Sequence, residues 1–283
     1  MRAVAVMPLL AVICLLASAP AKAADRDFLT SDGVRLHYTE TGQGHTIVLV
    51  PGWTMPAWIW DAQIADFARH FRVIAFDPRA QGDSETAPSG YDAQRRGEDI
   101  AELIRQVGAD PVLLVGWSLG VLDVLSYVHA HGDARIAGLV LVDNSVGEEP
   151  APMPSRHRRV ARLPASREAR MRLFVSSMFA HPRPPAYLDR LTAACLRTPR
   201  DAAAALLNYE EPRSFWREAV YATGRPVLYL VTPRFAGQAE NLRLHDPVAE
   251  SVVVRGVGHA MFVDDPGRFD ALVADFIRRR VWR

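Results

Sequence analysis

The chain has 283 residues, of which 49% are apolar and 23% are charged, and its 33 basic side chains nearly balance its 32 acidic ones. A chain of this length buries about three-quarters of the surface that its unfolded form exposes, so it can form a large core without disulfides or metals. The composition excludes a disordered or collagen-like chain, and a formal net charge of +1 gives no field that would attract nucleic acid as a partner.

Residues 1–23 have the pattern of a secretory signal peptide. Arg2 precedes the apolar run 3–16, and small residues follow that end at Ala23, where we expect cleavage. The alternative is an uncleaved membrane anchor, but the run is shorter than the roughly 20 residues that a bilayer span requires. Ile13 stands before Cys14, where a lipoprotein signal needs a small residue. We therefore expect a periplasmic or secreted protein, with no stable membrane insertion after cleavage and Cys195 as its one cysteine.

In the mature chain, 24–283, short β-branched runs alternate with longer helical stretches. This alternation is typical of a single α/β domain with a mostly parallel central sheet and helices on both faces. The predicted strands are Val34–Glu40, Thr46–Val50, Val73–Asp77, Val112–Val115, Leu139–Val142, Val227–Val231 and Ser251–Val254. The predicted helices of this core are 61–70, 92–107, 119–131, 237–245 and 266–279.

The interval 145–221 interrupts the alternation and is too long for one connecting helix. It opens with a stretch rich in Pro and Arg, and helical candidates follow at 166–180, 185–196, 199–209 and 212–221. We predict a helical cap inserted over one end of the sheet, between core segments 24–144 and 222–283, because a long structureless loop is unusual in a compact domain. The alternative is a set of extra core helices on the flank of the sheet.

The strongest local signal is Gly116-Trp117-Ser118-Leu119-Gly120, which lies between the strand Val112–Val115 and a helical stretch. A serine in G-x-S-x-G between strand and helix sits on a tight turn that presents its hydroxyl above the sheet edge. The motif alone is weak because Gly and Ser are common, but its placement between strand and helix indicates a nucleophile. We therefore predict that Ser118 is the catalytic nucleophile.

A serine hydroxyl is a poor nucleophile at neutral pH and requires a histidine base. Of the nine histidines, His259 follows the last predicted strand and so lies at the carboxyl end of a strand, as Ser118 does. Attack on a carbonyl also creates an oxyanion, and losing one N–H donor aimed at it costs about 2.7–4 kcal/mol. We expect these donors to be the backbone N–H groups of Leu119 and of Trp53, where Gly52 permits the required turn.

These motifs resemble the α/β-hydrolases, specifically the bacterial arylesterases and cofactor-free haloperoxidases, over essentially the whole mature sequence. The stretch from Asp77 to Ser84 is similar to the D-x-R-x-x-G-x-S turn of that family, and Gly258-His259 also agrees with it. The resemblance implies a serine nucleophile, a histidine base, an oxyanion hole, small ester-type substrates, and neither a metal nor a cofactor. Three charged residues are expected to be structural: Asp77, Arg79 and Asp123.

The sequence departs from the family pattern at two places. Pro51 stands where these relatives usually have a histidine, and Phe235 stands where the acidic partner of the histidine is usual, nine residues after Pro226. A histidine without an acid to fix its tautomer loses about four orders of magnitude in rate. The identity of the acid therefore decides whether the chain is a competent enzyme.

Geometry favours Asp143 as the acid, because it ends the strand beside the one that carries Ser118. An aspartate at this place can also simply bind loop amides. Glu148 and Glu149 on the same loop, and Glu240 in the helix after Phe235, remain alternatives, as does an enzyme without an acid.

The sequence predicts a secreted serine hydrolase of the carboxylesterase type that cleaves small esters through an acyl-enzyme. One alternative is another serine-dependent reaction on this scaffold, on lactones, carbon–carbon bonds or peracids. Another is a degenerate hydrolase that acts as a binding module, which Phe235 at the expected acid position favours. Dehalogenase and epoxide hydrolase chemistry is disfavoured because it needs a carboxylate where Ser118 stands.

Overall fold

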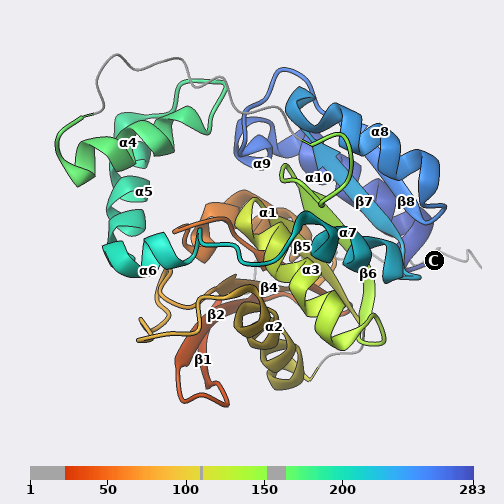
Figure 1. The fold of residues 1–283 in the computed structure, drawn as a ribbon, viewed down its shortest axis with the longest axis horizontal. Helices are drawn as coiled ribbons and strands as arrows, with labels where there is room; N and C mark the ends of the chain where they lie inside the picture. The colour runs from red at the N-terminus through yellow and green to blue at the C-terminus, as the bar shows by residue number, and fades with distance from the viewer. Residues whose placement is uncertain (1–22, 109–110, 152–163) are drawn as a thin grey trace, which may run out of the picture.

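The computed structural model describes residues 23–108, 111–151 and 164–283. Residues 1–22, most of the predicted signal peptide, lie outside the described residues. The described part of the chain forms one eight-stranded sheet in the order β1-β2-β4-β3-β5-β6-β7-β8, in which only the pairs β1–β2 and β2–β4 are antiparallel (Figure 1). The strands are β1 Ala24–Leu29, β2 Arg35–Thr41, β3 Thr46–Val50, β4 Arg72–Asp77, β5 Val112–Trp117, β6 Ile136–Val142, β7 Val227–Val231 and β8 Ala249–Val253.

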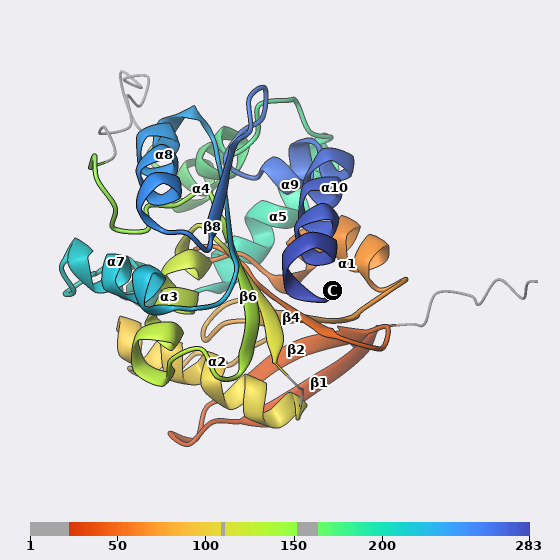
Figure 2. The ribbon, with the colours of Figure 1, turned by 90° about the vertical axis from the view of Figure 1, so that its right-hand side faces the viewer.

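Helices cover both faces of the sheet, which confirms the predicted α/β-hydrolase fold. Figure 2 shows one group of helices on one face and a second group on the other. The first group comprises α2 Ala93–Val107, α3 Leu119–His131, α7 Arg213–Ala222 and α8 Ala236–His245. The second group comprises α1 Asp61–Phe67 and α10 Pro266–Phe276, which continues into a π-helical turn, Ile277–Val281.

The core consists of two apolar clusters, one on each face of the sheet. Strands β3, β5 and β7 are buried along their whole length, because both faces are covered. This explains why their sequences are continuous apolar runs. No helix in the described ranges is long and apolar enough to cross a membrane.

The helices between β6 and β7 lie in two places, and the name cap is used below for the first three of them. The helices α4 Arg167–Ser177, α5 Pro185–Arg197 and α6 Arg200–Ala205 stand to one side of the sheet in Figure 1. In contrast, α7 packs on α3, where Phe215 stacks on His129 with 4.0 Å between the ring centroids. The predicted cap range 145–221 is therefore too wide at its end, since α7 belongs to the layer that covers the sheet.

The sequence missed one strand and several short helices. Strand β1 lies at the sheet edge, and most of its residues are exposed, so it lacks an apolar alternation that would reveal it. The 3-10 turns Ala57–Trp60 and Pro233–Phe235 and the one-turn helix α9 Met261–Asp264 are too short for a periodic pattern.

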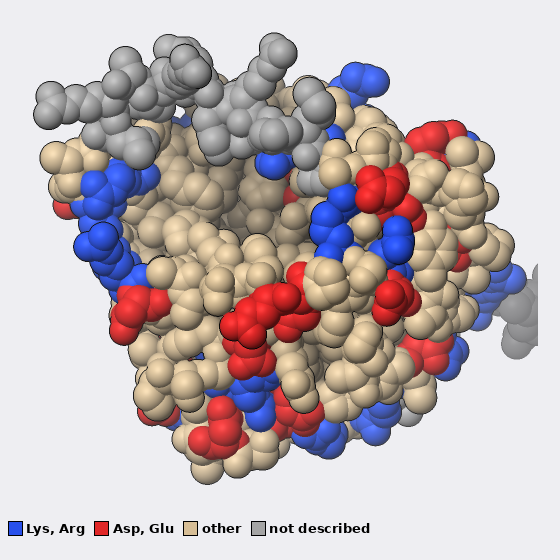
Figure 3. Space-filling model, viewed as in Figure 1, with Lys and Arg blue, Asp and Glu red and all other residues tan. Residues whose placement is uncertain are grey.

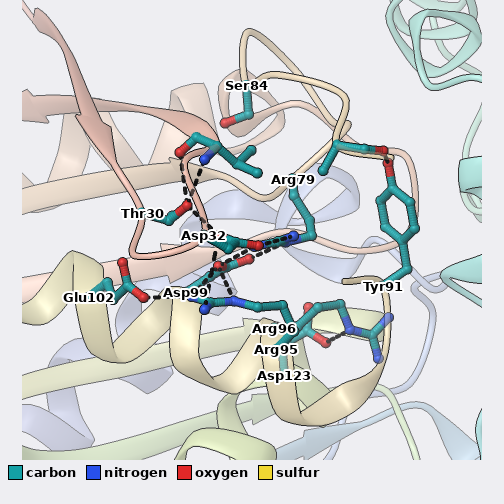
Figure 4. Close-up of polar contacts among 12 residues, drawn as sticks. Thr30, Asp32, Arg79, Ser84, Tyr91, Arg95, Arg96, Asp99, Glu102 and Asp123 are labelled. Atoms are coloured by element: carbon teal, nitrogen blue, oxygen red, sulfur yellow. Dashed lines mark hydrogen bonds and ion pairs between the residues drawn. The ribbon is translucent and has the colours of Figure 1, made fainter. Parts of the chain in front are cut away.

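A buried ion network fixes the turn that follows β4. Figure 4 shows Arg79 between Asp32 and Asp99, and its Nε lies 2.6 Å from an Asp99 oxygen. Nearby, Asp123 of α3 pairs with Arg96 of α2, with 3.0 Å between Oδ1 and Nε. The described contacts agree with the expected structural roles of Arg79 and Asp123.

Candidate active site

Ser118 lies on a tight turn between β5 and α3. Its backbone has φ +55° and ψ −119°, a conformation that L-residues rarely adopt. The glycines beside it are required by space, since a Cβ on Gly116 would lie 2.4 Å from the Gly120 carbonyl oxygen. A Cβ on Gly120 would lie 2.4 Å from the Val50 carbonyl oxygen. The G-x-S-x-G pattern therefore reflects a turn that presses against its own helix and against β3.

The structure brings Ser118, His259 and Asp143 into one hydrogen-bonded chain. His259 Nε2 lies 2.8 Å from Ser118 Oγ, and His259 Nδ1 lies 2.8 Å from Asp143 Oδ2. Because a carboxylate only accepts hydrogen bonds, His259 Nδ1–H donates to Asp143. The Nε2 atom then carries no proton and accepts a hydrogen bond from the Ser118 hydroxyl. The His259 side chain is 32% exposed while that of Asp143 is 4% exposed. The buried Asp143 carboxylate therefore fixes the tautomer of the histidine that is hydrogen-bonded to Ser118.

Asp143 begins the loop after β6 with φ +48°. Its second oxygen accepts the Thr232 N–H at 2.7 Å, at the end of β7. The neighbouring Tyr229 is buried, and burial together with the negative charge of Asp143 raises its pKa well above the usual value. The Tyr229 hydroxyl therefore stays protonated and donates to the Asn144 carbonyl oxygen at 2.6 Å. Asp143 is thereby tied to the residue that follows β7.

The other acid candidates bind elsewhere. Glu148 is buried and accepts hydrogen bonds from the Tyr221 hydroxyl and from Asn241 Nδ2. Glu149 pairs with Arg213, and Glu240 is exposed and pairs with Arg243 on its own helix. Phe235, at the usual place of the acid, is 4% exposed and belongs to the core cluster that contains Tyr229. None of these carboxylates contacts His259 in the described part of the chain.

The two residues expected to supply oxyanion-hole N–H groups, Trp53 and Leu119, lie near Ser118 in the fold. Leu119 is the first residue of α3, and a Cβ on Gly52, next to Trp53, would lie 3.0 Å from Ser118 Cβ. Among the described residues, neither the Trp53 nor the Leu119 N–H donates to another protein group. The following Thr54 has φ +59°, and its N–H donates to the buried Gln81 side chain. Both N–H groups therefore remain available to a bound oxygen.

Trp53 also contacts two of the cap helices. The indole Nε1 of Trp53 donates to the Ala203 carbonyl oxygen of α6 at 2.7 Å. Its ring also meets Phe174 of α4 edge to face, with 5.1 Å between centroids. Figure 3 shows a hollow beside the helices α4 to α6 whose visible walls are mostly neither acidic nor basic. The arrangement suits an uncharged organic group.

One group of side chains in the described ranges has the spacing of metal ligands, namely His37, Asp77 and Asp83. Both Asp77 oxygens already accept hydrogen bonds, from Ala57 N–H at 2.6 Å and from His37 Nδ1 at 2.8 Å. Asp77 also accepts the Asp83 N–H at 3.1 Å. These contacts order the turn after β4, which is the structural role expected for Asp77.

Sequence reasoning missed two side chains that fix the site. Trp117 Nε1 donates to the His259 carbonyl oxygen at 2.8 Å. Asn144 Nδ2 donates to the Ser118 carbonyl oxygen at 2.8 Å. Trp117 occupies the variable position of G-x-S-x-G, and Asn144 directly follows the acid candidate. Each lies next to a predicted site residue in the sequence, and this adjacency is the signal that could have identified them.

Comparisons with known proteins show to which family this chain belongs. The family model described as "Alpha/beta hydrolase family" matches residues 47–272. The chain is 35% identical over 113 residues to a non-heme haloperoxidase of Rhodococcus erythropolis, a match covering 40% of this chain and 41% of that protein. It is 37% identical over 89 residues to a soluble epoxide hydrolase of Corynebacterium sp. strain C12, covering 31% of each. The matched segments thus span less than half the length of these curated relatives.

Similarity to solved structures extends over more of the chain. The crystal structure of a candidate aryl esterase from Burkholderia cenocepacia superposes with a TM-score of 0.80 at 26% identity, and covers 92% of this chain and 100% of that one. The resemblance to arylesterases and non-heme haloperoxidases predicted from the sequence is thereby confirmed. The chain belongs to the alpha/beta hydrolase family.

Proposed function

We propose that this protein is a serine hydrolase that cleaves carboxylic esters through an acyl-enzyme. The observation that carries the proposal is the chain of hydrogen bonds from Ser118 Oγ through His259 to Asp143, with 2.8 Å at each step. This chain lies near the Trp53 and Leu119 N–H groups, which donate to no other group among the described residues, and this supports acyl transfer over a binding role. The candidate aryl esterase of Burkholderia cenocepacia, which is similar in structure, points to the same substrate class.

In the proposed reaction, His259 Nε2 removes the Ser118 proton while Oγ attacks the ester carbonyl carbon. The Trp53 and Leu119 N–H groups stabilise the negative charge that develops on the carbonyl oxygen. His259 then returns the proton to the leaving alcohol, and the acyl group remains on Ser118. Water, deprotonated by His259, attacks the acyl carbon and releases the acid. The Asp143 carboxylate stabilises the imidazolium at each stage.

A related reaction uses the same intermediate with a different acceptor. If hydrogen peroxide replaces water at the acyl-enzyme, the product is a peracid and Ser118 is regenerated. Similarity to a non-heme haloperoxidase favours this as the second candidate activity. The ratio of acid to peracid formed from one ester at increasing peroxide concentration measures it.

A fluorophosphonate probe tests the main proposal. We expect the protein to be labelled stoichiometrically and the Ser118→Ala variant not at all, while a panel of small esters is hydrolysed by the wild type alone. An absence of labelling and hydrolysis in the folded wild-type protein would instead favour a binding module.

We also propose that residues 1–23 direct export, so that the protein works in the periplasm or outside the cell. The proposal is supported by the arginine, apolar run and small residues of that segment. Mass spectrometry of the protein from each cell fraction tests it. We expect an N-terminus at Ala24 in the exported fraction, and an intact N-terminus retained in the cytoplasm would contradict export.

A further inference from the structure

His259 lies in the loop between β8 and α9, and the backbone of residues 258–260 is held there by Trp117, Met178 and Asp264. The His259 carbonyl oxygen accepts a hydrogen bond from Trp117, as described above. The Ala260 N–H donates to the Met178 carbonyl oxygen at 3.1 Å, directly after α4 of the cap. The Gly258 N–H donates to Asp264 Oδ2 at 2.7 Å. The residues before and after His259 are therefore anchored separately.

The Asp264 carboxylate also binds the cap. The oxygen that accepts the Gly258 N–H accepts the Ala180 N–H at 2.8 Å as well. Its other oxygen pairs with the Arg183 guanidinium at 2.5 Å. The Asp264 side chain is fully buried, so this carboxylate is shared between the segment 178–183 and the His259 loop without access to water.

The two segments also meet in direct contact. A Cβ on Gly258 would lie 2.4 Å from the Met178 carbonyl oxygen and 2.7 Å from the Ala180 nitrogen. The connection between α4 and α5 runs beside α9 in Figure 2. Gly258 is thus required by the close approach of the cap, and the loop cannot move toward the cap without a clash.

Helix capping does not account for Asp264. The side chain that caps α10 is the next residue, Asp265, which accepts the Arg268 N–H at 3.2 Å. Burial opposes ionisation of Asp264, but the Ala180 N–H, Arg183 and the Gly258 N–H outweigh it and lower its pKa. The group is therefore a carboxylate at neutral pH, with three donors directed at it.

We propose that Asp264 is a positioning residue that makes the placement of His259 depend on docking of the cap segment 178–183. This inference rests on the proposed function, since it assigns Asp264 a role in presenting the base to Ser118. Asp264 itself does not reach the reacting atoms. When the cap segment leaves, Ala260 loses its contact with Met178, and Asp264, which holds Gly258, loses its partners Ala180 and Arg183.

Three variants separate the parts of this proposal. Asp264→Asn keeps one acceptor oxygen for the two N–H groups but presents an NH₂ group to Arg183. Arg183→Met keeps the carboxylate and removes only the cap cation. Arg197→Met is the matched control, because it breaks another ion pair between cap and core, with Asp83 at 2.8 Å, at an exposed place away from His259.

The measurements are the second-order rate of fluorophosphonate labelling, kcat and KM for one ester, and Tm, with rates taken well below the Tm of every variant. A misplacement of about 1 Å can lower a rate by roughly 100-fold. We expect Asp264→Asn to lower the labelling rate and kcat by about 10- to 100-fold with KM changed less than about threefold. We expect a smaller loss in Arg183→Met and rates within about twofold of wild type in Arg197→Met.

Each of these measurements tests one part of the proposal. A wild-type labelling rate in folded Asp264→Asn would overturn the positioning role. A loss in Asp264→Asn with Arg183→Met equal to the control would overturn the dependence on the cap. A Tm drop without any rate change would show that Asp264 is only structural. If the wild-type protein itself is not labelled, the proposed function fails, which is a different result from all of these.

Discussion

Asp143 accepts a hydrogen bond from His259 Nδ1 at 2.8 Å, although 116 residues separate the two in sequence. The other Asp143 oxygen accepts the Thr232 N–H at 2.7 Å, so the orientation of the carboxyl group is fixed from both sides. Each Asp143 oxygen thus accepts from its own donor. The effect of replacing one of these oxygens can therefore be predicted.

Asp143→Asn should abolish most ester turnover while the fold persists. Thr232 N–H requires an oxygen, so the new NH₂ group faces His259 Nδ1 and donates to it. The histidine then carries its proton on Nε2 and cannot accept the Ser118 proton, which costs about four orders of magnitude in kcat. Steady-state ester hydrolysis with circular dichroism measures this, and an unchanged kcat would remove Asp143 from the mechanism.

Glu240→Gln should leave ester hydrolysis unchanged, because Glu240 is exposed and contacts Arg243 on its own helix. Glu148→Gln should lower Tm instead, since Glu148 accepts hydrogen bonds from Tyr221 and Asn241 in a buried place. Thermal melts and kcat for both variants check this pair of outcomes. A large fall in kcat in folded Glu240→Gln would contradict the geometry.

Gln81→Met should destabilise the conformation of the loop that carries the Trp53 N–H. It leaves the buried Thr54 N–H without its acceptor, which costs about 1–3 kcal/mol of folding free energy. Because Thr54 has φ +59°, the loop can relax away from this conformation, and we expect kcat to fall as well. Urea unfolding and kcat measure the two effects, and Asp83→Asn in the same turn is the exposed control.

His37 makes stability depend on pH. Its hydrogen bond to Asp77 raises the pKa of His37, although burial opposes this. The protonated form is thus favoured in the folded protein over the unfolded chain, whose histidine pKa is about 6.5. The stabilisation is complete below about pH 6.5 and is lost as the pH rises through the folded pKa. The difference in unfolding free energy between wild type and His37→Gln should shrink over that rise, and a constant difference would refute this linkage.

Arg96→Met should be strongly destabilising because it leaves Asp123 buried without a cation. Burial raises the pKa of Asp123 to about 6, and Arg96 is the charge that opposes this. Breaking a buried pair costs about 3–5 kcal/mol, and the double variant Arg96→Met/Asp123→Asn should recover much of it. Arg105→Met, which breaks the exposed pair with Glu98, should cost about 0–1 kcal/mol. Urea unfolding compares the three.

The parts that could be predicted from sequence are those with a local physical signature. Ser118 stands in a turn whose glycines have no alternative, and the buried strands are continuous apolar runs. The Asp143 prediction came from strand order, which only required that two strands be neighbours. The edge strand β1 and the place of α7 could not be predicted, because exposure removes the apolar signal in one case and tertiary packing decides the other. The contacts of Trp117 and Asp264 join distant segments and leave no pattern along the chain.

The place of Asp143 at the start of the segment between β6 and β7 has a consequence for protein engineering. A chimera that takes this whole segment from a relative with its acid after β7 would lose the carboxylate and gain none, since Phe235 occupies the other place. The crossover must therefore come after Asn144, whose side chain steadies the Ser118 turn. Recombination libraries of this family would tolerate new caps on this chain only with that junction.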